Sequence, residues 1–227
     1  MKKEEIMQKP NLSDFDYLLW DLDGTLTASA PGIINCVKYA LSSIGIDETD
    51  MAKLNLFIGP PLSESFQKIY GFSKEKSLEL VAKYQERYTE KGIWENSLFD
   101  GVKETLAALK AKGKHLIVAT AKPEIYMNPI IEKFGIAEFF EFAGGADLKI
   151  GRDAKDQVIS YVVEKCNLED EVEKGRVLMI GDRNNDIEGA HKNKIPCCAC
   201  LWGYGNMKEF EKYHADFVIE KPEDLLA

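Results

Sequence analysis

Short apolar runs recur along the chain, and each is followed by a longer segment with the residue spacing of a helix. Each run is too short for a helix and too continuously apolar for a strand that exposes one face to water. Strands buried on both faces are typical of a parallel sheet whose connections are helices. The sequence therefore predicts an α/β fold with a doubly wound, Rossmann-like parallel sheet. The runs are Tyr17–Trp20, His115–Ala119, Val177–Ile180, Cys197–Leu201 and, more weakly, Phe217–Ile219.

One long interval interrupts this alternation. Between Leu26 and Leu98 no run predicts a strand, and apolar residues follow helical spacing instead. A normal crossover needs roughly a dozen residues, so we predict an inserted all-helical cap subdomain at residues 27–97. The α/β core would then comprise residues 1–26 and 98–227. Because ligands bind beyond the carboxyl ends of parallel strands, an insert directly after the first strand is expected to lie over the site.

Two residues, one inside this region and one just after it, are candidate helix caps. Ser73 precedes a helical pattern inside the insert, and Asp100 precedes the helical pattern that follows it. Ser and Asp side chains accept hydrogen bonds from the free N–H groups of a first helical turn. We therefore expect both residues to begin helices.

Composition excludes several classes of function. The chain has 38 acidic and 29 basic residues, a net charge of −9, whereas nucleic-acid surfaces need an excess of Lys and Arg. We therefore expect no nucleic-acid partner, although a small phosphorylated metabolite needs only a local cationic pocket. No apolar run reaches the roughly 18 residues of a membrane helix, and residues 1–17 lack the apolar segment of a secretory signal.

The five cysteines have no regular spacing, which fits free thiols in a reducing compartment. We therefore expect a cytoplasmic protein. We also expect a monomer or a weak homodimer, with no membrane partner. Three of the cysteines are clustered, but they lie in an apolar run and no second group completes four metal ligands, so we interpret them as core residues. These are Cys197, Cys198 and Cys200.

The first apolar run ends in two carboxylates. Asp21 and Asp23 are two residues apart, so both are expected to project to the same side at the carboxyl edge of the sheet. Such a pair repels itself when buried, which favours a cation beside it. Gly24 permits a sharp turn away from the sheet, and Thr25 follows it.

A second acidic strand end follows Val177–Ile180, where Gly181 precedes Asp182 and Asp186. In a parallel sheet it shares an edge with the first. Asp21, Asp182 and the backbone oxygen of Asp23 would form a half-shell of hard oxygen donors, which suits Mg²⁺. Asp186 could bind a metal-bound water or orient this shell, or it could cap the following helix.

A third site element follows the run His115–Ala119. Thr120 offers a hydroxyl that is followed by free backbone N–H groups at the start of a helix, a combination that either binds an anion or simply caps the helix. One cation could neutralise a phosphate and a carboxylate together. Lys155, at the start of a later helix, is the preferred candidate, with Lys149 and Arg152 as alternatives.

These motifs resemble those of the haloacid dehalogenase superfamily of phosphohydrolases with a helical cap inserted after the first strand. The segment Asp21–Leu26 resembles its first motif, Thr120 its second, Lys155 its third, and Gly181-Asp182 with Asp186 its fourth. The resemblance extends from about Tyr17 to Leu226. Ala119–Pro123 and Leu201–Gly205 are similar to the phosphoglycolate phosphatase group. The chain departs from that pattern at Thr27–Ser29, where an acid-serine pair is usual, and at Asp156, where proline is usual after the lysine.

The resemblance implies a phosphatase of a small phosphate monoester that forms an aspartyl-phosphate intermediate and uses Mg²⁺. Asp21 would be the nucleophile and Asp23 the acid and base, while Thr120 and Lys155 would stabilise charge. The implied metal ligands are Asp21, Asp23, Asp182 and Asp186. The implied phosphate-binding residues are Gly24, Thr25, Thr120, Ala121 and Lys155.

Other functions on related scaffolds remain open. A 5′-nucleotidase would use the same chemistry on another ester, and a sugar phosphomutase of the β-phosphoglucomutase type would return the phosphoryl group to a sugar. A receiver module also carries acids at strand ends, but it is about half this length and needs neither a second carboxylate nor an insert. The loop Trp202–Gly205 either closes one side of the pocket or fills the core.

Overall fold

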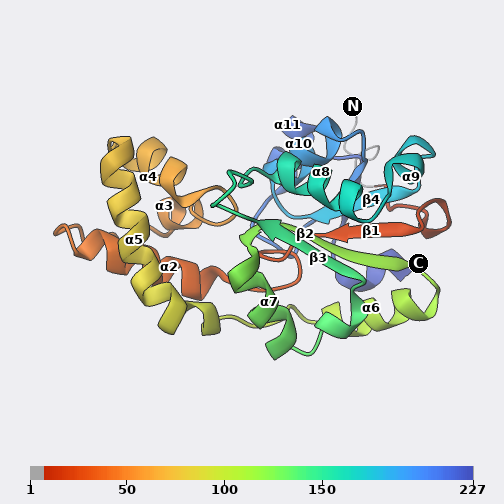
Figure 1. Cartoon of the computed structure of the whole chain (residues 1–227), viewed down its shortest axis with the longest axis horizontal. Coiled ribbons are helices and arrows are strands. Elements are labelled where there is room, and N and C mark those ends of the chain that lie inside the picture. Colours follow the sequence, from red (N-terminus) through yellow and green to blue (C-terminus); the bar gives the residue numbers. More distant parts are fainter. Residues whose placement is uncertain (1–7, 227) are drawn as a thin grey trace. The chain divides into compact units, whose positions relative to one another are not determined.

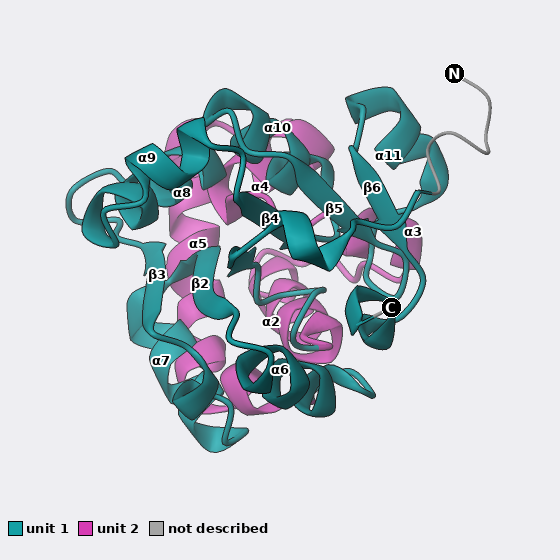
Figure 2. Cartoon of the chain, turned by 90° about the vertical axis from the view of Figure 1, so that its right-hand side faces the viewer, with its two compact units in different colours: residues 1–27, 98–227 teal, residues 28–97 magenta. Residues whose placement is uncertain are grey.

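The computed structural model describes residues 8–226, which form two compact units. One unit contains residues 1–27 and 98–227, and the other contains residues 28–97 (Figure 2). The breaks lie one residue from the boundary predicted at 26/27 and at the predicted boundary 97/98.

The larger unit is built on a six-stranded parallel sheet (Figure 1). The strand order is β3-β2-β1-β4-β5-β6, the order of a doubly wound sheet in which the direction of winding reverses between β1 and β4. The predicted fold class is therefore confirmed. The strands are β1 (Tyr17–Trp20), β2 (His115–Pro123), β3 (Phe142–Ala146), β4 (Val177–Gly181), β5 (Cys197–Cys200) and β6 (Phe217–Ile219).

The strand β3 is absent from the sequence prediction. Its sequence is Phe-Ala-Gly-Gly-Ala, which has few of the β-branched and aromatic residues that mark a strand. Gly144 and Gly145 are nevertheless suited to this place, since a Cβ on Gly144 would lie 2.5 Å from the Val162 side chain and one on Gly145 would lie 2.6 Å from the Lys122 carbonyl oxygen. Close packing, not propensity, selects this strand.

Helices cover both faces of the sheet (Figure 1). The helices α8 and α10 pack on one face and contact each other, with α11 against α10, while α6 and α7 pack on the opposite face. The core includes Leu19, Ile117 and Met179, all of which are fully buried. The helices of this unit are α6 (Val102–Ala111), α7 (Glu124–Lys133), α8 (Lys155–Lys165), α9 (Glu169–Glu173), α10 (Asn184–Lys192) and α11 (Met207–Tyr213), with short 3₁₀ turns η1 (Leu12–Asp14), η3 (Ala137–Phe139) and η4 (Pro222–Leu226).

The register of the three central strands aligns their carboxyl ends. Trp20, the last residue of β1, pairs with Val118 of β2 and with Ile180 of β4. The residues that follow these positions therefore emerge at one edge of the sheet. The start of α6 differs from the prediction, because Gly101 in the left-handed conformation (φ 78°) precedes the helix and Asp100 makes no cap.

The smaller unit is helical, and no strand occurs in residues 28–97, all of which the structure describes. Its longest helix, α5, packs against α2 and α4, and Ser73 caps α5 by accepting a hydrogen bond from the Lys76 N–H, as predicted. Arg87 donates two hydrogen bonds, of 2.8 and 2.7 Å, to the Glu95 carboxylate. The helices are α2 (Ala30–Ser42), α3 (Met51–Asn55), α4 (Leu62–Tyr70) and α5 (Lys74–Glu90), followed by the 3₁₀ turn η2 (Gly92–Trp94).

Candidate active site

The turn after β1 places a buried carboxylate at the edge of the sheet. Asp21 directly follows the strand, and its side chain is only 6% exposed. The chain then turns sharply, with the Gly24 N–H donating to the Thr27 carbonyl at 2.8 Å and Gly24 at φ 90°. A Cβ at this glycine would lie 2.5 Å from Asp182 Oδ1. Gly24 is therefore required both by its conformation and by the approach of the second acidic motif.

The second motif lies at the end of β4. Asp182 and Asp186 are completely buried, and the Asp186 Oδ2 atom accepts hydrogen bonds from the Asp182 and Arg183 N–H groups at 3.0 Å each. These bonds satisfy N–H groups at the start of α10 that no helical carbonyl can reach. Thr25 donates to Asp182 Oδ1 at 3.3 Å, so the two motifs are in direct contact.

Lys155 joins the two acidic strand ends. It is the first residue of α8, and its buried ammonium lies 2.6 Å from Asp21 Oδ1 and 2.7 Å from Asp186 Oδ1. It also donates to the Ala119 carbonyl at 3.2 Å. Burial would lower the pKa of this ammonium, but the charges of Asp186 and Asp21 outweigh burial and raise it. Lys155 is therefore held as a cation against the carboxylate predicted to be the nucleophile.

The aspartates are destabilised as anions by their surroundings. Burial raises the pKa of Asp21 to about 6, opposed by Lys155, while Asp186 contributes to the rise. Burial, followed by the charges of Asp186 and Asp21, raises the pKa of Asp182 well above its ordinary value. A cation bound beside Asp21 and Asp182 would reduce the repulsion between carboxylates that contributes to both raised pKa values.

These three aspartates form a candidate metal centre. One carboxylate oxygen of each lies within 4.8 Å of the other two, and all three side chains are buried. Hard oxygen donors of this kind suit Mg²⁺. Asp186 already contacts Lys155 and two N–H groups, so its geometry favours orienting the site over binding the ion directly. The donor set therefore fits the predicted cation.

The end of β2 brings a second lysine to the site. Pairing with β3 shifts register between Ala119 and Pro123, and within this irregular stretch Thr120 is buried and its hydroxyl contributes to lowering the pKa of Asp21. Lys122 donates to Asp23 Oδ2 at 2.7 Å, and this ion pair was not predicted. The only sequence signal was the position of Lys122 within Ala119–Pro123. Ala121 lies half-exposed beside them.

The loop after β5 donates hydrogen bonds to the second acidic motif and to the turn after β1. The Tyr204 N–H donates to Asp182 Oδ2 at 2.7 Å, and the Trp202 indole donates to the Thr25 carbonyl at 2.9 Å. A Cβ on Gly203 would lie 2.6 Å from Asp182 Oδ2, so only glycine fits there without displacement. This backbone donor was also missed, because no side-chain pattern marks it.

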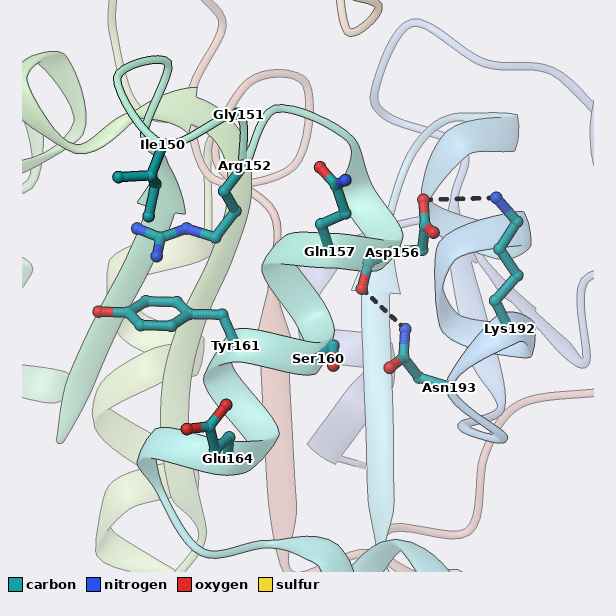
Figure 3. Close-up of a pocket in the computed structure, with 10 residues that line it drawn as sticks. All are labelled: Ile150, Gly151, Arg152, Asp156, Gln157, Ser160, Tyr161, Glu164, Lys192 and Asn193. Carbon is teal, nitrogen blue, oxygen red and sulfur yellow. Dashed lines mark hydrogen bonds and ion pairs between the residues drawn. The ribbon is translucent and has the colours of Figure 1, made fainter.

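The alternative cations lie elsewhere. Lys149 is exposed, and Arg152 pairs with Glu124 at 2.8 Å while its guanidinium lies 3.6 Å from the centre of the Tyr161 ring. Arg152 and Tyr161 line a cavity of about 510 Å³ along α8 (Figure 3). None of the three clustered aspartates lines it. Lys155 is therefore the lysine that the fold brings to Asp21.

The clustered cysteines are buried in β5, as the interpretation of a core strand requires. They are free, and burial raises the pKa of each thiol. Within residues 8–226, the group of side chains found close enough to hold a metal consists of aspartates, not cysteines. No helix in that range has the length and apolar character needed to cross a membrane.

Comparison with known proteins identifies the family. A family model described as haloacid dehalogenase-like hydrolase matches residues 18–200, a range that contains Asp21, Thr120, Lys155, Asp182 and Asp186. The chain belongs to the haloacid dehalogenase-like hydrolases. The resemblance on which the sequence prediction rested is thereby confirmed.

Relatives of this chain include proteins named as phosphatases and nucleotidases. A 5′-nucleotidase from Pseudomonas aeruginosa is 39% identical over 86% of this chain and 87% of its own length. A phosphoglycolate phosphatase from Yersinia pseudotuberculosis is 30% identical over 91% of this chain and 90% of its own length. The crystal structure of a predicted phosphatase from Clostridium acetobutylicum has a TM-score of 0.88, 37% identity, and covers 93% of this chain and 96% of that one. The chain is accordingly an enzyme of the phosphoric monoester hydrolase class.

Proposed function

We propose that this hydrolase is a Mg²⁺-dependent phosphatase that cleaves a small phosphate monoester through an aspartyl-phosphate on Asp21. The observation that supports this best is the setting of Asp21, a buried carboxylate at a strand end whose Oδ1 atom lies 2.6 Å from the Lys155 ammonium. A phosphoryl group bound to Asp21 would meet the same ammonium. Lys155, Thr120 and the Ala121 N–H are therefore proposed to hold its equatorial oxygens.

In the first step, a carboxylate oxygen of Asp21 forms a bond to phosphorus as the bond from phosphorus to the ester oxygen breaks. Asp23 gives its proton to that oxygen, which leaves as an alcohol. In the second step, water attacks phosphorus, Asp23 takes a proton from the water, and the bond from Asp21 to phosphorus breaks. Inorganic phosphate is released, and both aspartates return to their starting states.

The proposed ligands for Mg²⁺ are Asp21, Asp182 and the backbone carbonyl of Asp23, with Asp186 orienting them. When bound, the ion supplies positive charge that offsets the repulsion between the Asp21 carboxylate and the phosphate. Gly24 and Thr25 keep the turn close to Asp182, so they are proposed to shape the phosphate-binding end of the site. The expectation that the helical unit lies over the site stays a prediction.

The leaving group is proposed to be small, with 2-phosphoglycolate as the first candidate because of the motifs that resemble the phosphoglycolate phosphatase group. A nucleoside 5′-monophosphate is the second candidate, favoured by the 39% identity to a 5′-nucleotidase. A phosphomutase would use the same aspartates but would return the phosphoryl group to a sugar. It would therefore release little inorganic phosphate.

The experiment that tests this proposal is phosphate release from a panel of monoesters with and without Mg²⁺. The panel contains 2-phosphoglycolate, nucleoside 5′-monophosphates, β-glucose 1-phosphate and p-nitrophenyl phosphate. We expect hydrolysis of at least one metabolite with a higher kcat/KM than for p-nitrophenyl phosphate, and loss of hydrolysis with a chelator.

The matched control is Asp21→Asn, which is nearly isosteric but lacks the nucleophilic oxygen. It should abolish turnover and the incorporation of labelled phosphate into the protein while leaving the circular dichroism spectrum unchanged. Full residual hydrolysis by this variant would refute the assignment of Asp21. Conversion of β-glucose 1-phosphate into an isomer without phosphate release would favour the mutase instead.

A further inference from the structure

Lys122 is a charged residue in the motif Ala119–Pro123 to which the proposed chemistry gives no role. It lies on β2 two residues after Thr120, in the stretch where pairing with β3 shifts register. An irregularity in a strand can redirect side chains near an active site, and Lys122 and Thr120 both act on an aspartate at the end of β1. This places Lys122 and Thr120 on the side where the aspartates gather.

The Lys122 side chain makes a buried ion pair with Asp23. Its Nζ atom donates to Asp23 Oδ2 at 2.7 Å, and the two side chains are 5% and 14% exposed. The residues are 99 positions apart in the sequence, so the contact exists only because β1 and β2 are neighbours in the sheet. A lysine side chain loses considerable rotamer freedom when it is buried and held in this way. Lys122 is therefore not a solvated surface lysine.

Among the described residues, only one of the two oxygens of the Asp23 carboxylate is hydrogen-bonded. Its Oδ1 atom is buried and makes no hydrogen bond to the described residues, while Oδ2 is occupied by Lys122. A buried oxygen without a partner is unfavourable, and such a group persists where another molecule completes it. The carboxylate thus presents one oxygen that is fixed and one that is available.

We propose that Lys122 is a positioning residue for Asp23. By holding Oδ2, it fixes the rotation of the carboxyl group and directs Oδ1 to the leaving oxygen in the first step and to the attacking water in the second. The proton that moves in each step is carried on Oδ1, and Lys122 keeps all its protons throughout. This inference rests on the proposed function, because it needs Asp23 to exchange protons with substrate and water.

Loss of such positioning has a specific kinetic signature. A poor leaving group needs protonation as its bond breaks, whereas p-nitrophenolate leaves without it. Lys122→Met removes the ammonium and keeps an unbranched apolar side chain. We expect it to lower kcat for an alkyl monoester at least tenfold, to affect p-nitrophenyl phosphate only a few-fold, and to leave KM for both nearly unchanged. Lys122→Arg should recover part of the lost kcat, because its guanidinium can still donate to Asp23.

A double-variant cycle tests whether Lys122 acts through Asp23. In an Asp23→Asn background, adding Lys122→Met should change kcat less than about twofold, because nothing is left to position. Lys149→Met is the matched control, since Lys149 is exposed and should tolerate the change without kinetic effect. Thermal unfolding of each variant checks that the fold is kept, and Lys122→Gln replaces Lys122→Met if the latter fails to fold.

Two outcomes would overturn the proposal. A rise in KM for both esters with unchanged kcat would mean that Lys122 binds the substrate directly. Multiplicative losses in the double variant would mean that it acts independently of Asp23. Either result leaves the proposed function intact. The proposed function itself fails only if the wild type releases no phosphate or if Asp21→Asn retains full turnover.

Discussion

Replacing Gly203 with alanine should separate the metal site from the stability of the fold. This glycine lies in the loop after β5, directly behind Asp182. The new Cβ would lie 2.6 Å from Asp182 Oδ2 and closer still to the Asp182 Cβ and the Gly24 carbonyl oxygen. Ordinary contacts begin at 3.4 Å, so the carboxylate must move by at least about 0.8 Å to clear Oδ2, and relieving the two closer contacts requires a larger shift. The Tyr204 N–H, one residue further on, would also lose its 2.7 Å hydrogen bond to the same carboxylate.

The size of the effect follows from these distances. Mg²⁺ requires oxygen ligands at about 2.0–2.1 Å in a near-octahedral arrangement, and a site tolerates deviations of only about 0.2 Å. We therefore expect Mg²⁺ affinity to fall roughly 10- to 100-fold, the usual consequence of disturbing the support of a metal ligand. That is about 1.4–2.8 kcal/mol of binding free energy. Steric overpacking should also lower the free energy of unfolding of the metal-free protein by about 1–3 kcal/mol.

The assay is isothermal titration of Mg²⁺ into Gly203→Ala, with chemical denaturation of the metal-free protein alongside. The matched control is Gly175→Ala, since Gly175 has φ 71° and no atom near its missing Cβ. Left-handed backbone conformation disfavours alanine by roughly 1–2 kcal/mol, so the control should lose similar stability without losing Mg²⁺ affinity. Equal Mg²⁺ affinity in wild type and Gly203→Ala would refute the argument that this loop positions Asp182.

Two further predictions concern pH and the helical unit. The pKa of Asp21 is raised to about 6 in the folded protein, so protonation of Asp21 stabilises the folded, metal-free protein relative to the unfolded chain. This stabilisation is complete below about pH 4, the ordinary pKa of an aspartate, and is lost as pH rises through 6. The Tm of the metal-free protein should therefore fall between about pH 4 and 6. Mg²⁺ should raise Tm more at about pH 7.5 than at pH 5, because it binds deprotonated carboxylates. An equal rise at both values would contradict this. Arg87→Met should lower the free energy of unfolding by about 1–2 kcal/mol, because it removes two charged hydrogen bonds to Glu95 in a partly buried pair. An unchanged midpoint of chemical denaturation would show that this ion pair contributes nothing to stability.

The sequence by itself determined the elements that depend on neighbouring residues. Five of the six strands were predicted because buried parallel strands appear as continuous apolar runs, and the acids that end β1 and β4 were predicted to meet because parallel strands share an edge. The Ser73 cap was found for the same reason, since a cap is a local hydrogen bond. The Asp100 cap was wrong, because Gly101 adopts the left-handed conformation and begins α6 instead.

Only the tertiary structure decided the rest. The strand β3 is held by close packing of its glycines against neighbouring elements, which leaves no apolar run in the sequence. The choice of Lys155 over Lys149 and Arg152 depends on a contact between residues 134 positions apart, and the pairing of Lys122 with Asp23 on one 99 positions apart. Each lysine taken alone is compatible with a solvated surface. Burial identifies Lys155 and Lys122 as residues of the site, because an ammonium removed from water must form an ion pair with a carboxylate. Only the fold determines which carboxylate is within reach.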